Sequence, residues 1–265
     1  MGCGDWIMAT GQARVLKAKD PKAKILIGDG RVPHWEQWFN GNPDLIDPKT
    51  LRPGDAVKWV ISTAGARPYI DYDRTTPTHQ VFREDYRAHP GRIVISENWR
   101  VEAERLMKIA KVKGPYVVIE PNTKGSFGGN KVWPREYWER FVRNYGREFQ
   151  FVQIGAANSQ GLSGVRRVAT PNLMAAFAVL EKAAACVTTD GALHHACAAL
   201  EVPCVTIWGA RTNPKILGYP TQRNLYSGDG RNCGAIGSCE HCHAGMKAIA
   251  PEMVVKELRS CVPSA

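Results

Sequence analysis

The sequence predicts an α/β protein in which strands and helices alternate to build doubly wound parallel sheets. Short apolar runs rich in β-branched residues recur along the chain, each bounded by Gly, Pro or Asp. Segments with apolar residues at helical spacing lie between these runs, as in folds with parallel sheets. Of the 265 residues, 44% are hydrophobic and 23% charged, which excludes a disordered, collagen-like or coiled-coil chain.

The first part of the chain predicts one helix and three strands. Apolar spacing predicts a helix over residues 6–19, which ends before Asp20 and Pro21 because the residue preceding a proline disfavours the helical conformation. Apolar runs predict strands at residues 24–28, 56–61 and 92–96.

The second part alternates more regularly. Strands are predicted at residues 116–120, 149–154, 186–189 and 203–208. Helices are predicted at residues 134–145, 173–184 and 193–200, with a closing helix at 251–258. A charged, helix-like stretch at residues 102–113 separates the two parts. The chain therefore divides into an N-terminal α/β domain (1–100), a linker (101–115) and a C-terminal α/β domain (116–265).

The chain is strongly basic. It carries 35 Lys and Arg against 25 Asp and Glu, a net charge of +10. This charge predicts attraction to nucleic acid, an anionic surface or a phosphorylated substrate. The alternative is that the charge serves solubility alone. No window approaches the roughly 18 to 20 apolar residues of a membrane span, and the N-terminus lacks the layout of a signal peptide. We expect a cytoplasmic protein, with peripheral contact at the inner membrane face as an alternative.

Three loops are placed where ligands bind in α/β sheets, at the carboxyl ends of strands and the N-termini of helices. The first holds Gly2, Gly4 and Asp5, the second spans residues 122–131, and the third spans residues 188–195. Each loop alone also fits a backbone role, and an acidic residue there also fits a plain helix cap. Together the loops predict a phosphate-bearing ligand held between two domains.

The cysteines fall into two groups. Cys186, Cys197 and Cys204 lie in apolar stretches and are expected in the core. Near the C-terminus a weak zinc motif has a single Cys-x-x-Cys pair, and either of two neighbouring histidines completes it. The candidate set is Cys233, Cys239, Cys242 and His243, with His241 as the other choice of histidine. A loop with reduced thiols is the alternative.

Several motifs carry a resemblance to a known family. In residues 187–209 an acidic turn leads into a His-containing helix and then into Pro203 and Gly209, with five residues between them. This stretch resembles the signature of the heptosyltransferase family of GT-B glycosyltransferases, glycosyltransferase family nine. Residues 131–134, Lys-Val-Trp-Pro, resemble its Lys-x-Trp-Pro box. Residues 4–10 resemble its Gly-Asp-x-x-x-x-Thr opening, and Asn42 with Pro43 matches a small motif that follows.

The resemblance implies a GT-B fold, with two Rossmann-like doubly wound domains facing a cleft. It makes residues 1–100 the acceptor-side domain and residues 116–265 the nucleotide-sugar-binding domain. The family usually has a strand before the Gly-Asp loop, so a shortened N-terminal domain is expected. A second departure lies at Asp190, Gly191 and Ala192, where the family commonly has Asp-Ser/Thr-Gly. This difference removes a hydroxyl group that would face the phosphates of the sugar donor, so the identity of the donor stays open.

The implied activity is an inverting, metal-independent sugar transfer from a nucleotide-sugar to a hydroxyl acceptor. The resemblance makes Asp5 the base that takes the acceptor's proton. Positive charge and hydrogen-bond donors must stabilise the leaving nucleoside diphosphate. The candidates for this are Thr123, Lys124, Ser126, Lys131, Asp190, Gly191, Ala192, Leu193 and His195. No cofactor is implied, since the nucleotide-sugar is a substrate, and a structural zinc ion is the one exception considered.

Three kinds of partner remain open. The resemblance implies a lipopolysaccharide core or another surface glycan, lipid-linked or free. The positive charge fits equally well an acceptor on duplex DNA with hydroxymethylated bases, as in viral DNA. The modified base would then be flipped out of the duplex. A non-catalytic nucleotide-sugar or nucleic-acid binding protein is the third reading. Aromatic residues that suit stacking on a sugar or base, or a place in the core, are Trp35, Trp38, Phe39, Tyr69 and Tyr72.

Overall fold

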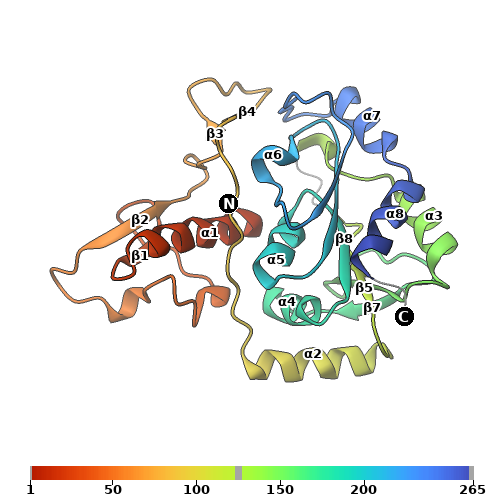
Figure 1. Ribbon diagram of the computed structural model, residues 1–265, viewed down its shortest axis with the longest axis horizontal. Coiled ribbons are helices and arrows are strands. Elements are labelled where there is room, and N and C mark those ends of the chain that lie inside the picture. Colours follow the sequence, from red (N-terminus) through yellow and green to blue (C-terminus); the bar gives the residue numbers. More distant parts are fainter. Residues whose placement is uncertain (1, 123–126, 263–265) are drawn as a thin grey trace.

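A six-stranded parallel sheet forms the centre of the computed structural model, which describes residues 2–122 and 127–262 (Figure 1). Its strands lie in the order β10-β9-β8-β5-β6-β7. They are β5 (Val117–Ile119), β6 (Phe151–Gly155), β7 (Arg166–Ala169), β8 (Ala185–Thr189), β9 (Cys204–Trp208) and β10 (Arg223–Tyr226). This is the doubly wound order, in which the winding direction reverses between β5 and β8.

Helices cover both faces of this sheet (Figure 1). On one face α3 (Arg135–Tyr145) and α8 (Pro251–Cys261) bury Trp138, Phe141 and Leu258 against the strands. On the other face lie α4 (Leu173–Glu181) and α5 (Ala192–Leu200). Residues 174–180 of α4 are all buried, because further helices cover its outer side. The short α6 (Pro214–Leu217) follows β9, and α7 (Glu240–Ala248) follows β10.

The N-terminal part is a smaller α/β unit. Helix α1 (Cys3–Lys19) leads into β1 (Lys24–Gly28), which pairs in parallel with β2 (Val57–Ile61). The connection between these strands contains the 3-10 turns η1 (Gln37–Phe39) and η2 (Pro48–Thr50). A small antiparallel hairpin follows, formed by β3 (Ile70–Asp71) and β4 (Val81–Phe82).

One hydrophobic core joins the two parts. Buried Ile7 and Phe39 from the N-terminal unit belong to the same cluster as Phe177 of α4. The rings of Trp38 and Phe177 meet edge to face, with centroids 5.9 Å apart. Two of the aromatic residues considered for ligand stacking, Trp38 and Phe39, are therefore core residues.

The strand predicted at residues 92–96 is wrong. The side chains alternate between buried and half-buried there, as in a strand, but the backbone bonds to side chains instead of to a neighbouring strand. The amide of Arg92 donates to Oγ1 of Thr10 at 2.9 Å, and its carbonyl accepts from the Asn42 side chain at 3.2 Å. The segment is extended because it packs beside α1, where Ile93 and Ile95 are buried.

The segment predicted as a linker contains most of a helix. Helix α2 (Glu97–Ile109) runs along α4 and buries Ala103 and Leu106. Arg100 binds Glu181 of α4 through two hydrogen bonds, each 2.9 Å long. The described helices include none that is long and apolar enough to cross a bilayer.

Candidate donor and catalytic site

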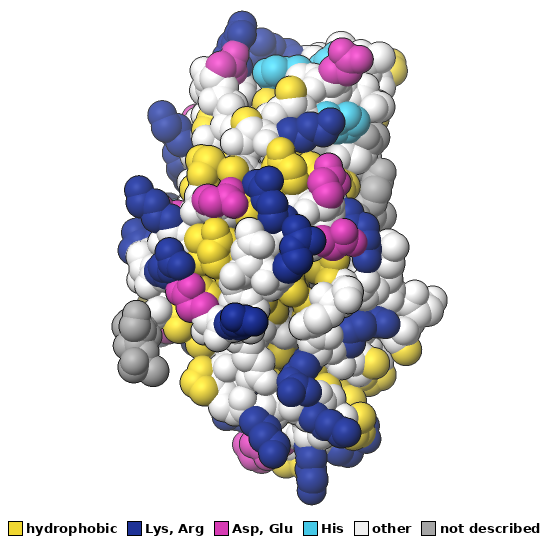
Figure 2. Space-filling model, turned by 90° about the vertical axis from the view of Figure 1, so that its right-hand side faces the viewer, with side chains coloured by type: hydrophobic (Ala, Val, Ile, Leu, Met, Phe, Trp, Pro, Cys, Tyr) yellow, Lys and Arg dark blue, Asp and Glu magenta, His cyan; other side chains and the backbone are white. Residues whose placement is uncertain are grey.

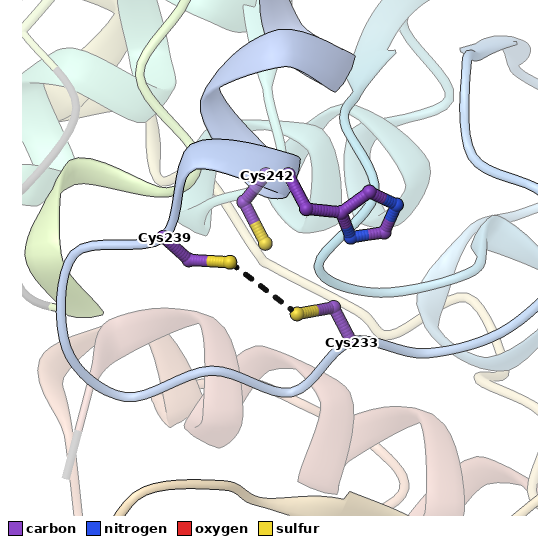
Figure 3. Close-up of side chains that lie close together, drawn as sticks. Cys233, Cys239 and Cys242 are labelled. Carbon is purple, nitrogen blue, oxygen red and sulfur yellow. Dashed lines mark hydrogen bonds between the residues drawn. The ribbon is translucent and has the colours of Figure 1, made fainter.

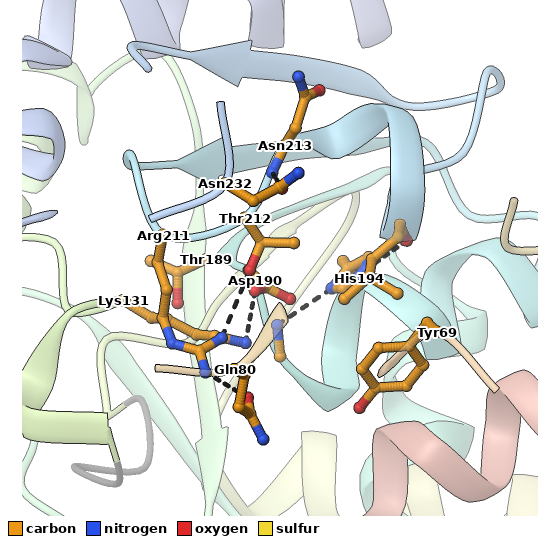
Figure 4. Close-up of polar contacts among 12 residues, drawn as sticks. Tyr69, Gln80, Lys131, Thr189, Asp190, His194, Arg211, Thr212, Asn213 and Asn232 are labelled. Carbon is orange, nitrogen blue, oxygen red and sulfur yellow. Dashed lines mark hydrogen bonds and ion pairs between the residues drawn. The ribbon is translucent and has the colours of Figure 1, made fainter. Parts of the chain in front are cut away.

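Two of the predicted ligand loops meet where the sheet reverses its winding. Lys131 lies in the loop after β5, and Asp190 directly follows β8, the neighbouring strand. Their side chains form an ion pair, with 2.5 Å between Nζ and Oδ2 (Figure 4). The carboxyl ends of strands at such a reversal are where ligands bind in open α/β sheets. The pair therefore marks the expected ligand position.

This ion pair is largely shielded from water. Burial alone would raise the pKa of Asp190, but the positive charges of Lys131 and Arg211 bring it below its usual value. Burial lowers the pKa of Lys131, and the charge of Asp190 opposes that shift. The Asp190 carboxylate is thus held ionised, with Lys131 as its partner.

A second buried cation lies beside this pair. The Arg211 side chain follows β9, is 3% exposed and points toward Lys131 and Asp190 (Figure 4). Its guanidinium donates to Oε1 of Gln80 at 2.5 Å and to two other neutral oxygens. It also stacks 4.0 Å from the ring centroid of Phe127. The two buried cations Lys131 and Arg211 share the one carboxylate of Asp190, so the group keeps a net positive charge that suits an anionic ligand.

The N-terminus of α5 adds hydrogen-bond donors next to these charges. The amide of Gly191 donates to Nδ1 of His194 at 3.0 Å, so Nε2 of His194 donates to the Leu217 carbonyl at 3.3 Å. The amides of Ala192 and Leu193, in the first turn, have no acceptor inside the helix. They and the helix dipole favour a phosphate at this end. His194, for which the motif predicts no role, therefore organises the helix start.

His195 lies at the contact between α5 and α1. Its Nδ1 is 2.7 Å from the hydroxyl of Tyr219, and burial holds its pKa well below the usual value, so the ring is neutral. Its other edge faces Gly4, where an added Cβ would stand 2.8 Å from the Cδ2 atom of His195. The histidine predicted to contact phosphate thus also fixes how closely the two helices approach.

Three donors hold the carboxylate of Asp5 near the start of α1. Its Oδ1 accepts from the Tyr69 hydroxyl at 2.5 Å. Its Oδ2 accepts from Nε of Arg67 at 3.3 Å and from the amide of Gly2 at 3.1 Å. A carboxylate has about four acceptor positions, so room for a further hydrogen bond remains. Asp5 is therefore both part of the helix start and oriented by the segment before β3.

The helix contact brings Asp5 to the donor loops. An added Cβ on Gly4 would lie 3.4 Å from the Cα of Ala192, so the N-terminal turns of α1 and α5 adjoin. The structure thus gathers Asp5, Lys131, the start of α5 and His195 into one region. Thr123, Lys124 and Ser126 lie outside the described residues.

Sequence reasoning missed several residues of this region. Arg67, Gln80 and Arg211 carry no Gly-rich or strand-to-helix signal, although Arg211 follows a predicted strand. For Tyr69 the sequence suggests stacking or a place in the core, whereas in the structure its hydroxyl binds Asp5. Tyr72 donates to the Ala64 carbonyl at 2.8 Å. The indole of Trp35 donates to Asn40, also at 2.8 Å.

A hollow of about 1020 Å³ lies elsewhere, at the amino ends of β5 and β6. Lys113, Arg147, Phe149 and Arg259 are among the residues that line it. Ligands of doubly wound sheets bind at the opposite edge, so we do not assign the donor to this hollow.

Among the residues that the structure describes, three groups of side chains have spacings that suit a metal ion. Cys186, Cys197 and Cys204 are fully buried, as the sequence predicts for core cysteines. A second group, formed by Asp190, His194 and His195, belongs to the donor region, where the ion pair and the helix start already engage its first two members. The third group is made of Cys233, Cys239, His241 and Cys242 (Figure 3). The expected fourth ligand, His243, is not part of it, and His241 takes that place because it brings a ring nitrogen close to the sulfurs.

A family model for glycosyltransferase family 9 (heptosyltransferase) matches residues 58–244. No curated protein sequence matches the chain.

Solved structures share the fold. The family 9 glycosyl transferase from Veillonella parvula is 14% identical, with 98% of this chain and 94% of that chain covered and a TM-score of 0.64. The Escherichia coli ADP-heptose lps heptosyltransferase II is 22% identical, with 64% of this chain covered and a TM-score of 0.50. This chain covers 53% of heptosyltransferase II, about half its length. The α/β, GT-B-type fold with a shortened N-terminal part is confirmed.

Proposed function

The chain belongs to glycosyltransferase family 9, the heptosyltransferase family, and on this premise we propose that it transfers a sugar from a nucleotide-sugar to a hydroxyl acceptor with inversion. The proposal rests on one observation. Asp5, at the start of α1, lies beside the start of α5 and the ion pair of Lys131 with Asp190. The division of labour follows the predicted domains, with residues 1–100 on the acceptor side and 116–265 on the donor side.

The proposed reaction is a single displacement at the anomeric carbon. The acceptor hydroxyl attacks this carbon while its proton passes to the Asp5 carboxylate, and the bond from the carbon to the diphosphate oxygen breaks. Tyr69 and Arg67 hold the carboxylate in one orientation, so the remaining acceptor position faces the incoming hydroxyl. Attack from the side opposite the leaving group inverts the configuration.

The leaving nucleoside diphosphate gains negative charge as the bond breaks. We assign its stabilisation to Lys131, Arg211 and the free amides of Ala192 and Leu193, with Asp190 orienting the lysine. Because protein groups supply this positive charge, the transfer step is proposed to need no metal ion. Adding Mg²⁺ or Mn²⁺ should then leave the rate unchanged, and a strict requirement for either ion would contradict this point.

The donor and acceptor are proposed by analogy. The E. coli protein of similar fold is named ADP-heptose lps heptosyltransferase II, a name that contains a nucleotide-sugar and lps. We propose a nucleoside-diphosphate sugar as the donor and a lipopolysaccharide core or another surface glycan, free or lipid-linked, as the acceptor.

A panel of nucleotide-sugars tests the donor. A ligand that binds only the folded protein stabilises it by about 2.7 kcal/mol at 100 times its dissociation constant, which a thermal-shift assay detects. The stabilising donor is then incubated with truncated lipopolysaccharide cores, and release of the nucleoside diphosphate is measured. Stabilisation by none of the nucleoside diphosphates or their sugars would reject the proposal.

DNA is a second candidate acceptor because of the net charge of +10. On the face that Figure 2 shows, Lys and Arg side chains spread over the whole surface with acidic groups between them. The deciding assay is label transfer from a nucleotide-sugar to duplex DNA with hydroxymethylated bases, with unmodified DNA as the control. Transfer to the modified DNA alone would favour this acceptor. Binding by charge alone would instead fall with log[salt], with a slope near −0.9 for each neutralised phosphate, and give no transfer.

A further inference from the structure

The segment between β10 and α7, together with the first turn of α7, brings four metal-ligand side chains to one point. Cys233, Cys239, His241 and Cys242 each offer one ligand atom, and these atoms all lie within 4.8 Å of one another. Cys242 is fully buried, Cys233 and Cys239 are half-buried, and His241 is exposed. Figure 3 shows the three sulfur atoms pointing toward a common centre. The group therefore has a closed inner side and a side open to solvent for the entry of an ion.

The spacing of the sulfurs fits a shared ion better than a disulfide. Sγ of Cys233 and Sγ of Cys239 are 3.7 Å apart. A tetrahedral zinc ion about 2.3 Å from each sulfur holds two of them about 3.8 Å apart. A disulfide needs about 2.05 Å, which would require both side chains to move. Three sulfurs and one imidazole are also a ligand set that zinc prefers.

The backbone holds this group in place through the donor region. The amide of Cys233 donates to the carbonyl of Ala210 at 3.2 Å, next to Arg211. The amide of Cys239 donates to the side chain of Asn130 at 3.0 Å, next to Lys131. Cys233 and Cys239 are thus each hydrogen-bonded to the residue that precedes one of the two cations assigned to the leaving diphosphate.

The same segment is bonded to the hairpin that reaches Asp5 and Arg211. The amide of Gln80 donates to the Gly234 carbonyl at 2.9 Å, and the amide of Ile236 donates to the Thr78 carbonyl at 2.8 Å. We propose that Cys233, Cys239, His241 and Cys242 bind one zinc ion, which fixes this segment and thereby holds the hairpin and the cationic side of the site together. The role is structural, so the ion takes no part in the transfer step.

Metal analysis of the whole protein, purified in reducing buffer without chelator, tests the proposal independently of any activity. We expect about one equivalent of zinc, as in closed four-ligand sites. Co²⁺ titrated into the metal-free protein should give visible bands of a tetrahedral thiolate site, and Zn²⁺ should abolish them. Cys239→Ser and Cys233→Ser should each lose the bound zinc.

Matched controls separate ligation from general damage. His241→Ala should lose zinc or bind it much more weakly, whereas His243→Ala and Cys261→Ser should keep the full equivalent. Cys239→Ser should also bind nucleoside diphosphate several-fold more weakly, while far-UV circular dichroism shows a folded chain. A metal-free protein in which Cys233 and Cys239 react with a thiol reagent and which takes up no Co²⁺ would overturn the proposal. A Cys233 to Cys239 disulfide in the native protein, or unchanged zinc in Cys239→Ser, would do so as well.

Discussion

The side chain of Asp5 serves two purposes at one position. It accepts a hydrogen bond from the amide of Gly2 at the start of α1. It also accepts hydrogen bonds from Tyr69 and Arg67, which lie more than sixty residues later in the chain. A plain helix cap needs only the first of these contacts. The two distant donors are what favour a catalytic role, and a sequence motif does not contain them.

Asp5→Asn should leave donor binding nearly unchanged and lower turnover by roughly 100-fold or more, the usual scale for loss of a general base. Asparagine keeps the shape of the side chain but takes up no proton. Steady-state kinetics with calorimetry of donor binding measure both effects, and the exposed Asp73→Asn is the control. Turnover equal to the parent would make Asp5 a cap only.

Lys131→Ala should weaken donor and nucleoside-diphosphate binding together, since a charge-assisted contact contributes about 1.5 to 3 kcal/mol. The variant also leaves the buried Asp190 carboxylate without its partner and should lower stability. The double variant with Asp190→Asn separates the two effects, because it should regain stability without regaining affinity. Calorimetry that finds unchanged affinity in Lys131→Ala would remove the lysine from the donor site.

Glu120 gives the protein a pH-dependent stability. Burial raises the pKa of this carboxyl, which directly follows β5, from 4.5 to about 7. Between these values the unfolded chain loses the proton while the folded chain keeps it, so the free energy of unfolding falls as the pH rises. Glu120→Gln should abolish this fall, which is of the order of 2 to 3 kcal/mol, in urea titrations at pH 4.5 to 8. The exposed Glu104→Gln should keep the parent's slope.

At the level of elements, periodicity predicted the strands and helices of the large sheet well, because each is a short apolar segment between clear boundaries. The strands β7 and β10 were missed because exposed Arg166, Arg167 and Arg223 interrupt their apolar pattern. The strand expected at residues 92–96 fails for the opposite reason, since its alternating pattern is genuine but its backbone partners are the side chains of Thr10 and Asn42. The apolar pattern of a segment shows which of its side chains are buried. Whether its backbone pairs as a strand depends on which element lies beside it.

The contact of α1 with α5 gives a test at this scale. Gly4→Ala should raise helix propensity by up to about 1 kcal/mol. The added Cβ would, however, stand 2.8 Å from His195, so the helices must separate and carry Asp5 away from the donor loops. We expect a lower melting temperature and about a tenfold or greater loss of kcat, because misplacement by about 1 Å is costly in catalysis. Gly65→Ala, whose Cβ would meet nothing within 4 Å, is the control, and equal losses in both variants would contradict the account.

For the whole molecule, the sequence divides the chain into two units, and the cluster that contains Ile7 and Phe177 extends across that division. Local patterns do not show which buried faces pack on each other, so this shared core could not be predicted. We retain the division into residues 1–100, 101–115 and 116–265 as a proposal about ligand roles and not about independent folding.

The shared core predicts one cooperative unfolding transition. Far-UV circular dichroism and tryptophan fluorescence should give coincident curves in urea. Trp38→Ala should shift the whole curve to lower urea, since removing a buried tryptophan costs about 3 to 5 kcal/mol. Two separate transitions in the parent protein, or a shift confined to one probe in the variant, would show that the parts unfold independently.

The ion pair between Lys131 and Asp190 has a consequence for product release. A site lined only by free cations would hold a spent nucleoside diphosphate tightly, and its departure would then limit the rate. If Lys131 binds the diphosphate as we propose, the Asp190 carboxylate replaces the departing phosphate oxygen on the ammonium group of Lys131. Because one anion replaces another beside the lysine, the free-energy cost of releasing the diphosphate is lower. On this view Asp190→Asn should make the diphosphate a stronger product inhibitor.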